Sequence, residues 1–188
     1  KAVLTHGFTV DGEGRKMSKS LGNTIEADKA IKQYGADVLR LWVSMVDFRE
    51  DMRISDELLK RVAEAYRKVR NTCRFLLSNL FDFDPATGHQ ITEPLDQYAM
   101  AVHSDFEAKI REAYEQHDYH ALHTLLVHYC TVDLSAFYMD VLKDRLYCDP
   151  PESVRRKRTQ TAMWHIADAL GRLIAPILPH TADEAWRL

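Results

Sequence analysis

The chain has 188 residues, of which 46% are hydrophobic, and it contains only seven glycines and six prolines. This composition is that of a globular chain able to build a core, and the scarcity of turn-forming residues favours helices over many short strands. The formal net charge of −3 excludes attraction of nucleic acid by overall charge, so any RNA contact must come from a local patch.

The cysteines and the hydropathy pattern indicate the cellular compartment. Cys73, Cys130 and Cys148 are widely spaced and match neither a disulfide framework nor a zinc pattern, which fits a reducing cytoplasm. No uninterrupted apolar run approaches a membrane span and no signal-peptide pattern occurs, so we expect a cytoplasmic chain with no membrane contact. Because the sequence begins at Lys1 without a methionine and stops at Leu188 within a helical pattern, we expect a piece of a longer protein.

The first 54 residues read as a small α/β piece. Short β segments are expected at residues 2–4, 8–10 and 52–54, and short helices at residues 27–34 and 37–46. Gly35 is the expected stop of the first of these helices.

A glycine-framed loop at residues 16–20 carries the chemistry of this piece. Lys16 and Lys19 bring two flexible point charges, Ser18 and Ser20 bring hydroxyls, and the neighbouring glycines allow a close approach of the backbone. Such a loop suits the binding of a polyanion. The alternative is a solvated loop with no ligand.

From Ser55 onward the sequence predicts long amphipathic helices joined by short connections, which is typical of an antiparallel bundle. Ser55, Asp118 and Ser153 are expected to cap three of the four long helices, and Thr181 a short last one. The inward stripe of the third long helix is expected to contain Leu122, Leu125, Leu126, Tyr129, Phe137, Val141 and Leu142. The predicted fold is therefore mainly α, with an α/β piece at residues 1–54 and a helical bundle at residues 55–188.

One face of the first long helix is basic. Between residues 60 and 74 the sequence has six basic residues and one acidic residue, an excess of one sign that is unusual for a solvated face. A second basic cluster, at residues 155–158, begins the fourth long helix, and there a solvated first turn and a contact with phosphate are both open. The residues of the first cluster expected to contact RNA are Lys60, Arg67, Arg70, Asn71 and Arg74.

Four histidines, at positions 117, 120, 123 and 128, crowd the third long helix. They lack both the His-Glu-x-x-His pattern and the carboxylate–His pairing of di-iron bundles. We therefore predict no metal site in this chain.

The sequence Lys-Met-Ser-Lys-Ser at residues 16–20, followed by Leu-Gly-Asn, resembles the signature loop of the class I aminoacyl-tRNA synthetases, whose lysines meet the phosphates of ATP. Essentially the whole chain resembles the bacterial isoleucyl-tRNA synthetases, from the end of the catalytic domain into the anticodon-binding bundle. Valyl and leucyl enzymes share the loop and the Gly-Ala-Asp helix, and the Arg-Asn-Thr and Lys-Asp-Arg-Leu-Tyr strings favour isoleucine. The strings that extend the resemblance are Leu-Thr-His-Gly-Phe (4–8), Tyr-Gly-Ala-Asp-Val-Leu-Arg-Leu-Trp (34–42), Glu-Asp-Met-Arg-Ile-Ser (50–55), Arg-Asn-Thr (70–72), Lys-Asp-Arg-Leu-Tyr (143–147) and Ala-Pro-Ile-Leu-Pro (175–179).

The resemblance implies a ligase that activates isoleucine with ATP and Mg²⁺ and transfers it to tRNA(Ile), whose anticodon stem and loop the bundle would recognise. It implies Lys19 as the first catalytic residue, with Lys16 supporting it. The residues that it implies for ATP binding are Lys16, Met17, Ser18, Lys19 and Ser20.

Several parts of such an enzyme are missing from this sequence. The His-Ile-Gly-His signature, the amino-acid pocket, the editing domain and the C-terminal module, which can hold zinc, do not occur, so the isolated chain is expected to be inactive. We also expect a monomer. Two alternatives from other classes are a non-catalytic helical module that binds RNA or protein, and a purely structural bundle.

Overall fold

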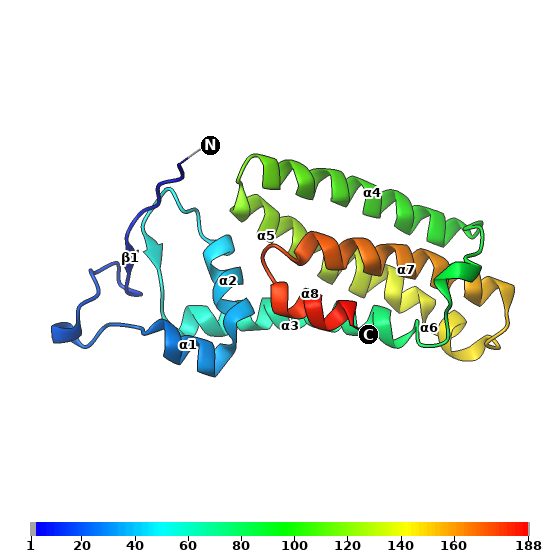
Figure 1. Ribbon diagram of the computed structural model, residues 1–188, viewed down its shortest axis with the longest axis horizontal. Helices are drawn as coiled ribbons and strands as arrows, with labels where there is room; N and C mark the ends of the chain where they lie inside the picture. The colour runs from blue at the N-terminus through cyan, green and yellow to red at the C-terminus, as the bar shows by residue number, and fades with distance from the viewer. Residues whose placement is uncertain (1–2, 188) are drawn as a thin grey trace.

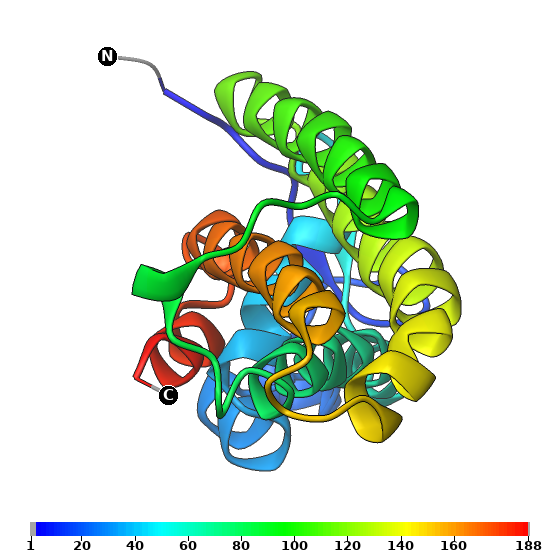
Figure 2. The ribbon, with the colours of Figure 1, turned by 90° about the vertical axis from the view of Figure 1, so that its right-hand side faces the viewer.

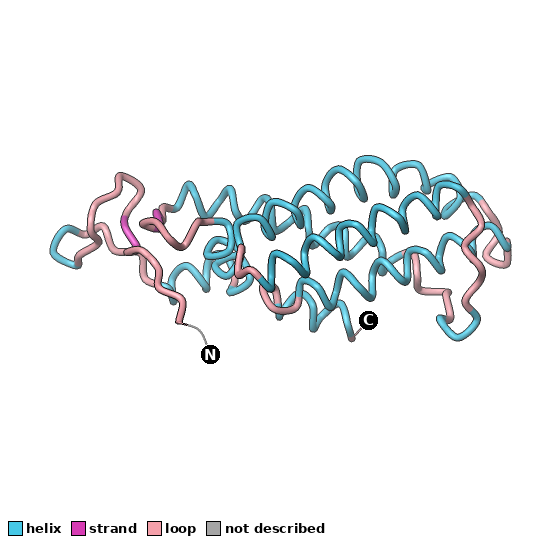
Figure 3. Tube along the Cα trace, turned by 90° about the horizontal axis from the view of Figure 1, so that it is seen from above, coloured by secondary structure: helices cyan, strands magenta, loops and turns pink. Residues whose placement is uncertain are grey.

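The structure of the chain is a computed structural model that describes residues 3–187. Long helices run along an elongated molecule and alternate in direction, so the predicted antiparallel bundle is confirmed, and the connections gather at its two ends (Figures 1 and 3). Seen along the bundle, α7 lies among the other helices (Figure 2). The helices of the bundle are α3 (Asp56–Ser78), α4 (Pro94–Glu115), α5 (Tyr119–His128), the π-helical stretch η3 (Tyr129–Tyr138), α6 (Met139–Cys148), α7 (Val154–Ile174) and α8 (Pro179–Trp186).

A small piece precedes the bundle and carries the loop at its outer end (Figure 1). The strands β1 and β2 pair in parallel, and α2 packs against α3 and α5, so that Val38, Leu41 and Trp42 join the core of the bundle. The elements of this piece are β1 (Thr9–Val10), the 3-10 turn η1 (Lys19–Leu21), α1 (Ala27–Tyr34), α2 (Ala36–Met45) and β2 (Met52–Arg53).

The predicted β segment at residues 2–4 is wrong where it can be compared. Val3 and Leu4 are exposed and belong to no strand, whereas residues 9 and 10 pair with β2. A strand needs a partner for its backbone groups, and β2 is only two residues long. Lys1, Ala2 and Leu188 lie outside the described residues.

Local signals set most helix ends where the sequence predicts them. Gly35 ends α1 with a φ of 91°, a conformation that favours glycine, and its N–H donates to the carbonyl of Ile31. The Ser55 hydroxyl accepts the N–H of Leu58 at 3.1 Å, and the Asp118 carboxylate accepts that of Ala121 at 3.0 Å. The linker between α3 and α4 contains the 3-10 turn η2 (Pro85–Thr87).

The inward stripe predicted for the third long helix is wrong at Phe137 and Val141 and is confirmed at Leu142, which is buried. Phe137 and Val141 are 45% and 54% exposed, whereas Leu134 and Tyr138 are buried. The reason is the π-helical stretch, in which each N–H bonds the carbonyl five residues back, so that side chains change face relative to an α-helix. The N–H of Met139, for example, donates to the carbonyl of Leu134.

The continuous helical segment Tyr119–Cys148 corrects the expectation that no apolar stretch approaches the length of a membrane span. By length and composition alone it meets the criterion for a membrane-spanning helix. Leu122, Leu126 and Leu142 in this segment are buried in the core of the bundle, and a core helix passes the same test.

The prediction that Thr181 caps the last helix is also wrong. The helix begins at Pro179, with Leu178 before it, and Thr181 lies inside its first turn. Proline suits that first position because its missing N–H would have no partner within the helix. Glu184, expected to complete a capping box, instead pairs with Arg70 of α3.

All three cysteines are free thiols. Cys73 and Cys130 are buried, and Cys148 is exposed at the end of α6. Burial raises the pKa of Cys73 to about 11 and that of Cys130 well above its ordinary value.

Candidate functional site

The lysine-bearing loop at residues 16–20 is a small, well-defined turn. Lys16 forms an antiparallel bridge with Val10, which returns the chain beside β1. The Ser18 hydroxyl accepts the N–H of Leu21 at 3.3 Å and caps η1. Gly22 closes the turn with a φ of 66° and donates its N–H to the carbonyl of Lys19.

A buried carboxylate, Asp11, organises the base of this loop. It is 7% exposed and accepts the N–H groups of Glu13 and Arg15 at 3.0 and 2.8 Å, the Arg15 guanidinium at 2.9 Å and the Asn23 amide at 2.9 Å. The Asn23 amide and the backbone N–H of Arg15 hold the pKa of this carboxyl well below its usual range. The Asn23 oxygen in turn accepts the N–H of Ser18 at 2.9 Å, so that both ends of the turn share one network.

The two lysines extend from this hydrogen-bonded base. Lys16 and Lys19 are exposed, and neither forms an ion pair with any residue between positions 3 and 187. Met17 is half-buried and packs against the core, and the hydroxyls of Ser18 and Ser20 lie 3.1 Å apart. Cations and hydroxyls presented in this way suit the oxygens of a phosphate chain.

Sequence reasoning missed the roles of Asp11 and Asn23. A signal was available, because Asp and Asn often bond the backbone two residues onward and so mark turns. The Asp11 contact with the N–H of Glu13 has this pattern.

The basic face predicted on α3 is largely neutralised. Lys60 pairs with Asp56 at 2.7 Å, Arg67 with Glu64, and Arg70 with Glu184 of α8 at 2.6 Å. The hydrogen bond from Arg70 lowers the pKa of the Glu184 carboxyl. Of the predicted RNA contacts, Arg74 is the cation that has no ion-pair partner within the described residues.

Arg74 and Asn71 line an open groove between α3 and the η3–α6 stretch. The groove has a volume of about 380 Å³, and α6 adds Lys143, which pairs with Asp140 at 2.7 Å. The structure therefore brings two of the five predicted RNA contacts together with a lysine that was not predicted. Lys60, Arg67 and Arg70 do not line this groove.

The second basic cluster is mainly structural. Arg156 is buried and donates two hydrogen bonds to Asp82, at 2.6 and 3.1 Å. Lys157 donates to the carbonyl of Asp82 at 2.9 Å, and Arg158 lies 3.7 Å from Glu93. These contacts tie the linker between α3 and α4 to the start of α7.

Two of the four histidines of the third long segment contact separate polar partners. His120 contacts the carbonyl of Met45 at 2.5 Å, and His128 lies 3.9 Å from Asp133. Burial lowers the pKa of His123. Between residues 3 and 187, no three His, Cys, Asp or Glu side chains are grouped as metal ligands.

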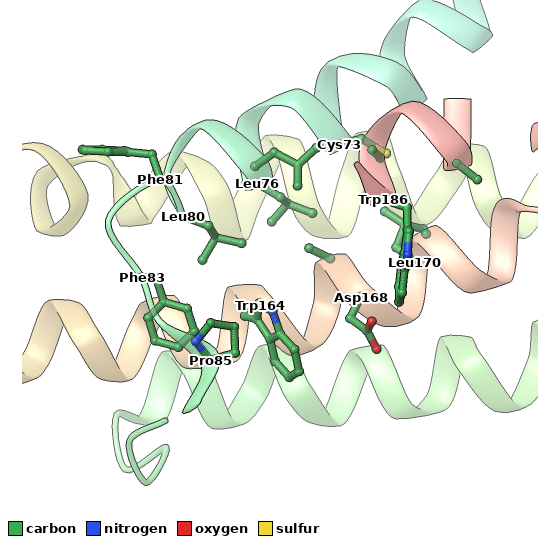
Figure 4. Close-up of a pocket in the computed structure, with 15 residues that line it drawn as sticks. Cys73, Leu76, Leu80, Phe81, Phe83, Pro85, Trp164, Asp168, Leu170 and Trp186 are labelled. Atoms are coloured by element: carbon green, nitrogen blue, oxygen red, sulfur yellow. The ribbon is translucent and has the colours of Figure 1, made fainter. Parts of the chain in front are cut away.

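A larger cavity, of about 440 Å³, opens between α3, the linker, α7 and α8 (Figure 4). Its lining is mostly apolar and aromatic, with Phe83, Trp164 and Trp186 around Leu76 and Leu80. None of the predicted site residues lines it, and its one carboxylate, Asp168, pairs with Arg172 at 3.0 Å.

Two family models match the chain. The model described as tRNA synthetases class I (I, L, M and V) matches residues 1–55, and the one described as anticodon-binding domain of tRNA ligase matches residues 96–188. The first contains the lysine-bearing loop, and the second begins in α4 and ends with the last helix.

Curated relatives give a more specific similarity. The isoleucine–tRNA ligases of Geobacillus kaustophilus and Symbiobacterium thermophilum are 52% and 53% identical to the chain over 192 and 189 residues. Each match covers 99% of the chain and 20% of the relative, so the chain spans about a fifth of the length of these proteins.

Two solved structures share the fold. A methionyl-tRNA synthetase from Mycobacterium tuberculosis, in complex with methionyl-adenylate, matches with a TM-score of 0.73 and 22% identity over 96% of the chain and 36% of its own length. A LeuRS–tRNA–LeuAMS ternary complex from Agrobacterium radiobacter K84 matches with a TM-score of 0.69 and 19% identity, over 97% of the chain and 22% of its own.

Proposed function

The chain belongs to the class I tRNA synthetases, as a segment of the isoleucine–tRNA ligase type, and on this premise we propose that it supplies two working parts to a longer ligase. Residues 1–54 supply the loop that contacts the phosphates of ATP. Residues 55–188 form the bundle that holds the anticodon stem and loop of tRNA(Ile). The observation that carries this proposal is the loop itself, with two exposed lysines on a base held by Asp11 and Asn23.

The first part acts during activation of the amino acid. The isoleucine carboxylate attacks the α-phosphate of ATP, the bond to pyrophosphate breaks, and negative charge builds on the departing pyrophosphate. Lys19, supported by Lys16, stabilises that charge more in the transition state than in the ground state. Mg²⁺ bound with ATP supplies further positive charge to the phosphates. The hydroxyls of Ser18 and Ser20 hold phosphate oxygens, and Met17 anchors the turn to the core.

The second part acts through the surface of the bundle. RNA single strands and loops are recognised by phosphate contacts and by side chains that reach splayed bases. Arg74 and Lys143 are the phosphate contacts of the groove, and Asn71 beside them offers an amide to a base edge. Lys60, Arg67 and Arg70 contribute further contacts from α3 outside the groove, where their carboxylate partners compete with phosphate.

The ligase activity requires the rest of the enzyme. Isoleucine binds outside this chain, so the 188 residues alone are expected to catalyse no exchange between pyrophosphate and ATP. The cytoplasmic location and the monomeric state stay predictions, and the first is supported by the free thiols.

The test of the loop uses the full-length ligase and isoleucine-dependent ATP–pyrophosphate exchange. Lys19→Ala should lower kcat by about 10²–10³-fold, the usual effect of removing a group that stabilises transition-state charge. Isoleucine binding, measured by calorimetry, should change little, because the lysine faces the phosphates.

The matched control is Lys32→Ala, which removes an exposed lysine of α1 outside the loop. It should leave exchange at the wild-type rate. A Lys19→Ala enzyme with unchanged kcat and a raised KM for ATP would mean that the lysine binds both states equally, and the assigned role would be wrong. Wild-type ligase without isoleucine-dependent exchange would favour the non-catalytic alternative.

A further inference from the structure

One face of α2 holds the junction between α7 and α8. Asp37 and Arg40 lie three residues apart in α2, so their side chains leave the helix on the same side. Both reach residues near the end of the chain, and neither belongs to the loop or to the basic groove.

Asp37 holds the beginning of α8. Its carboxylate is 4% exposed and accepts the N–H of Thr181 at 2.8 Å, the N–H of His180 at 3.4 Å and the Thr181 hydroxyl at 2.6 Å. The first N–H groups of a helix have no partner within the helix, and the helix dipole favours negative charge there. Leu178, the residue before α8, has no side-chain acceptor for these N–H groups. Asp37 of α2 therefore caps α8 in its place.

Arg40 holds the other side of the junction. Its guanidinium donates to the carbonyl of Ile177 at 2.8 Å and to that of Pro176 at 2.7 Å. These carbonyls follow Ile174, the last residue of α7, where unpaired oxygens and the helix dipole favour a cation. A negative and a positive side chain on one helix face thus match the two helix ends that meet there.

A fourth helix, α3, completes this clamp. Because the Thr181 hydroxyl gives its hydrogen to Asp37, the Tyr66 hydroxyl of α3 donates to the Thr181 oxygen at 2.9 Å. The clamp residues Asp37, Arg40, Tyr66 and Thr181 therefore join α2, α3, α7 and α8.

The same helix α2 is also tied to the loop-bearing piece. The indole N–H of Trp42 donates to the carbonyl of Arg53 in β2 at 3.1 Å. β2 pairs with β1, and β1 leads directly into Asp11 at the base of the lysine loop. α2 is thus common to the part that carries the loop and to the clamp on the bundle.

We infer that Asp37, Arg40 and Thr181 are positioning residues for transfer of the amino acid to tRNA, an inference that rests on the proposed function. They fix the bundle against the piece that carries the ATP loop, so that a tRNA held by the bundle delivers its 3′ end to the active site. They touch no reactant, and their effect is geometric. A displacement of about 1 Å between reacting groups lowers a rate by about 10²-fold.

The test compares Thr181→Val with Thr181→Ser in the full-length ligase. Valine keeps the shape of threonine and removes the hydroxyl between Tyr66 and Asp37, whereas serine keeps the hydroxyl. Three quantities are measured: isoleucine-dependent ATP–pyrophosphate exchange, the Kd for tRNA(Ile), and single-turnover transfer from preformed adenylate to saturating tRNA.

We expect Thr181→Val to lower the transfer rate by about 10-fold and Asp37→Ala by about 10²-fold. Exchange and the Kd should stay within about 2-fold of wild type, and Thr181→Ser should match wild type in all three. The control for general destabilisation is Ile166→Val, a buried position of α7 outside the clamp, compared at equal distance below the melting temperature. It should leave transfer within about 2-fold of wild type.

Wild-type transfer in Thr181→Val would overturn the inference, and so would an equal loss of transfer in Ile166→Val. If Asp37→Ala does not fold, the Thr181 pair still decides the matter. Failure of the proposed function has a different signature, because it would appear in the wild-type ligase as absent isoleucine-dependent exchange.

Discussion

His103 places an imidazole inside the core of the bundle. Its ring nitrogen Nδ1 lies 2.8 Å from the Tyr129 hydroxyl, and Tyr129 stacks on Phe106 with ring centroids 3.9 Å apart. The other ring nitrogen, Nε2, is buried and has no hydrogen-bond partner within the described residues. Burial lowers the pKa of His103, and this effect exceeds the opposing one of Glu107. The folded chain therefore favours the neutral ring.

This burial predicts an acid-sensitive stability. The unfolded chain binds a proton at His103 near the ordinary pKa of about 6.5, and the folded chain binds it only at lower pH. The contribution of neutral His103 to the free energy of unfolding is therefore fully present above the unfolded pKa. It is lost as the pH falls towards the folded pKa. Urea unfolding of the 188-residue chain should show a smaller free energy of unfolding at pH 5.5 than at pH 7.5. In His103→Phe this difference should shrink, and parallel pH profiles for the two proteins would contradict the prediction.

Single residues of the loop were predictable to different degrees. Lys16 and Lys19 could be recognised from sequence because exposed charge at a glycine-framed turn is a local property. The roles of Asp11 and Asn23 in holding the base of the loop were harder to predict. They depend on a hydrogen bond of 2.9 Å between residues that are twelve positions apart in the sequence. The role of Asp37 was further out of reach, since its partner Thr181 lies near the other end of the chain.

At the scale of elements, the π-helical stretch changes which side chains hold the bundle together. Leu134→Ala should lower the free energy of unfolding by about 2–5 kcal/mol, as expected for a buried leucine. Val141→Ala should change it by no more than about 0.5 kcal/mol, because that side chain is 54% exposed. Urea titrations of the chain, followed by circular dichroism, measure both.

These two variants distinguish the two registers directly, since a continuous α-helical stripe would bury Val141. If Val141→Ala lowered the free energy of unfolding as much as Leu134→Ala, the stripe predicted from sequence would be correct and the π-helical register wrong. Leu142→Ala is the control, because Leu142 is buried in the structure and inward in the predicted stripe, and it should lose about 2–5 kcal/mol.

The ends of elements follow local chemistry better than their interiors follow periodicity. Gly35 and Ser55 end and begin helices as predicted because each effect needs only a few neighbouring residues. No such local signal for the π-helical register was identified in the sequence. The start of α8 was misplaced for a related reason, since Asp37 of another helix holds its first N–H groups.

At the scale of the whole molecule, charge predicts how tRNA binding responds to salt. Affinity for tRNA should fall as salt rises, with a log–log slope of about −0.7 for each single-strand phosphate that is neutralised. Arg74→Ala and Lys143→Ala should each make this slope shallower by about that amount and weaken all tRNAs alike. Asn71→Ala should leave the slope unchanged and reduce the difference in affinity between cognate and non-cognate tRNA. Filter binding by the 188-residue chain at several salt concentrations measures these effects.

Lys109→Ala is the matched control for these variants, because Lys109 is an exposed lysine of α4 outside the groove, paired with Asp105 at 2.6 Å. It should leave the slope unchanged. If neutralising Arg155 abolished binding while the Arg74/Lys143 double variant bound normally, the RNA-binding surface would lie at the start of α7 and not in the groove.

The positive charge of the α3 face was overestimated from sequence for one local and one tertiary reason. The excess counted between residues 60 and 74 omits Asp56 and Glu57, which lie just before that window, and Glu184, which comes from α8. The first two are local and could have been counted. Glu184 could be paired with Arg70 only after the last helix had been placed on α3.

The unequal burial of the three thiols makes one of them a selective handle for spectroscopy. An alkylating dye reacts with the thiolate, and the raised pKa values of Cys73 and Cys130 leave those two almost entirely protonated at neutral pH. A maleimide fluorophore should therefore label Cys148, which is exposed and is the last residue of α6. Helix α6 lies towards the end of the molecule opposite the loop-bearing piece (Figure 1). A donor dye there and an acceptor on an ATP analogue would span the long axis of the chain, so energy transfer between them would report in real time how the bundle moves relative to the nucleotide.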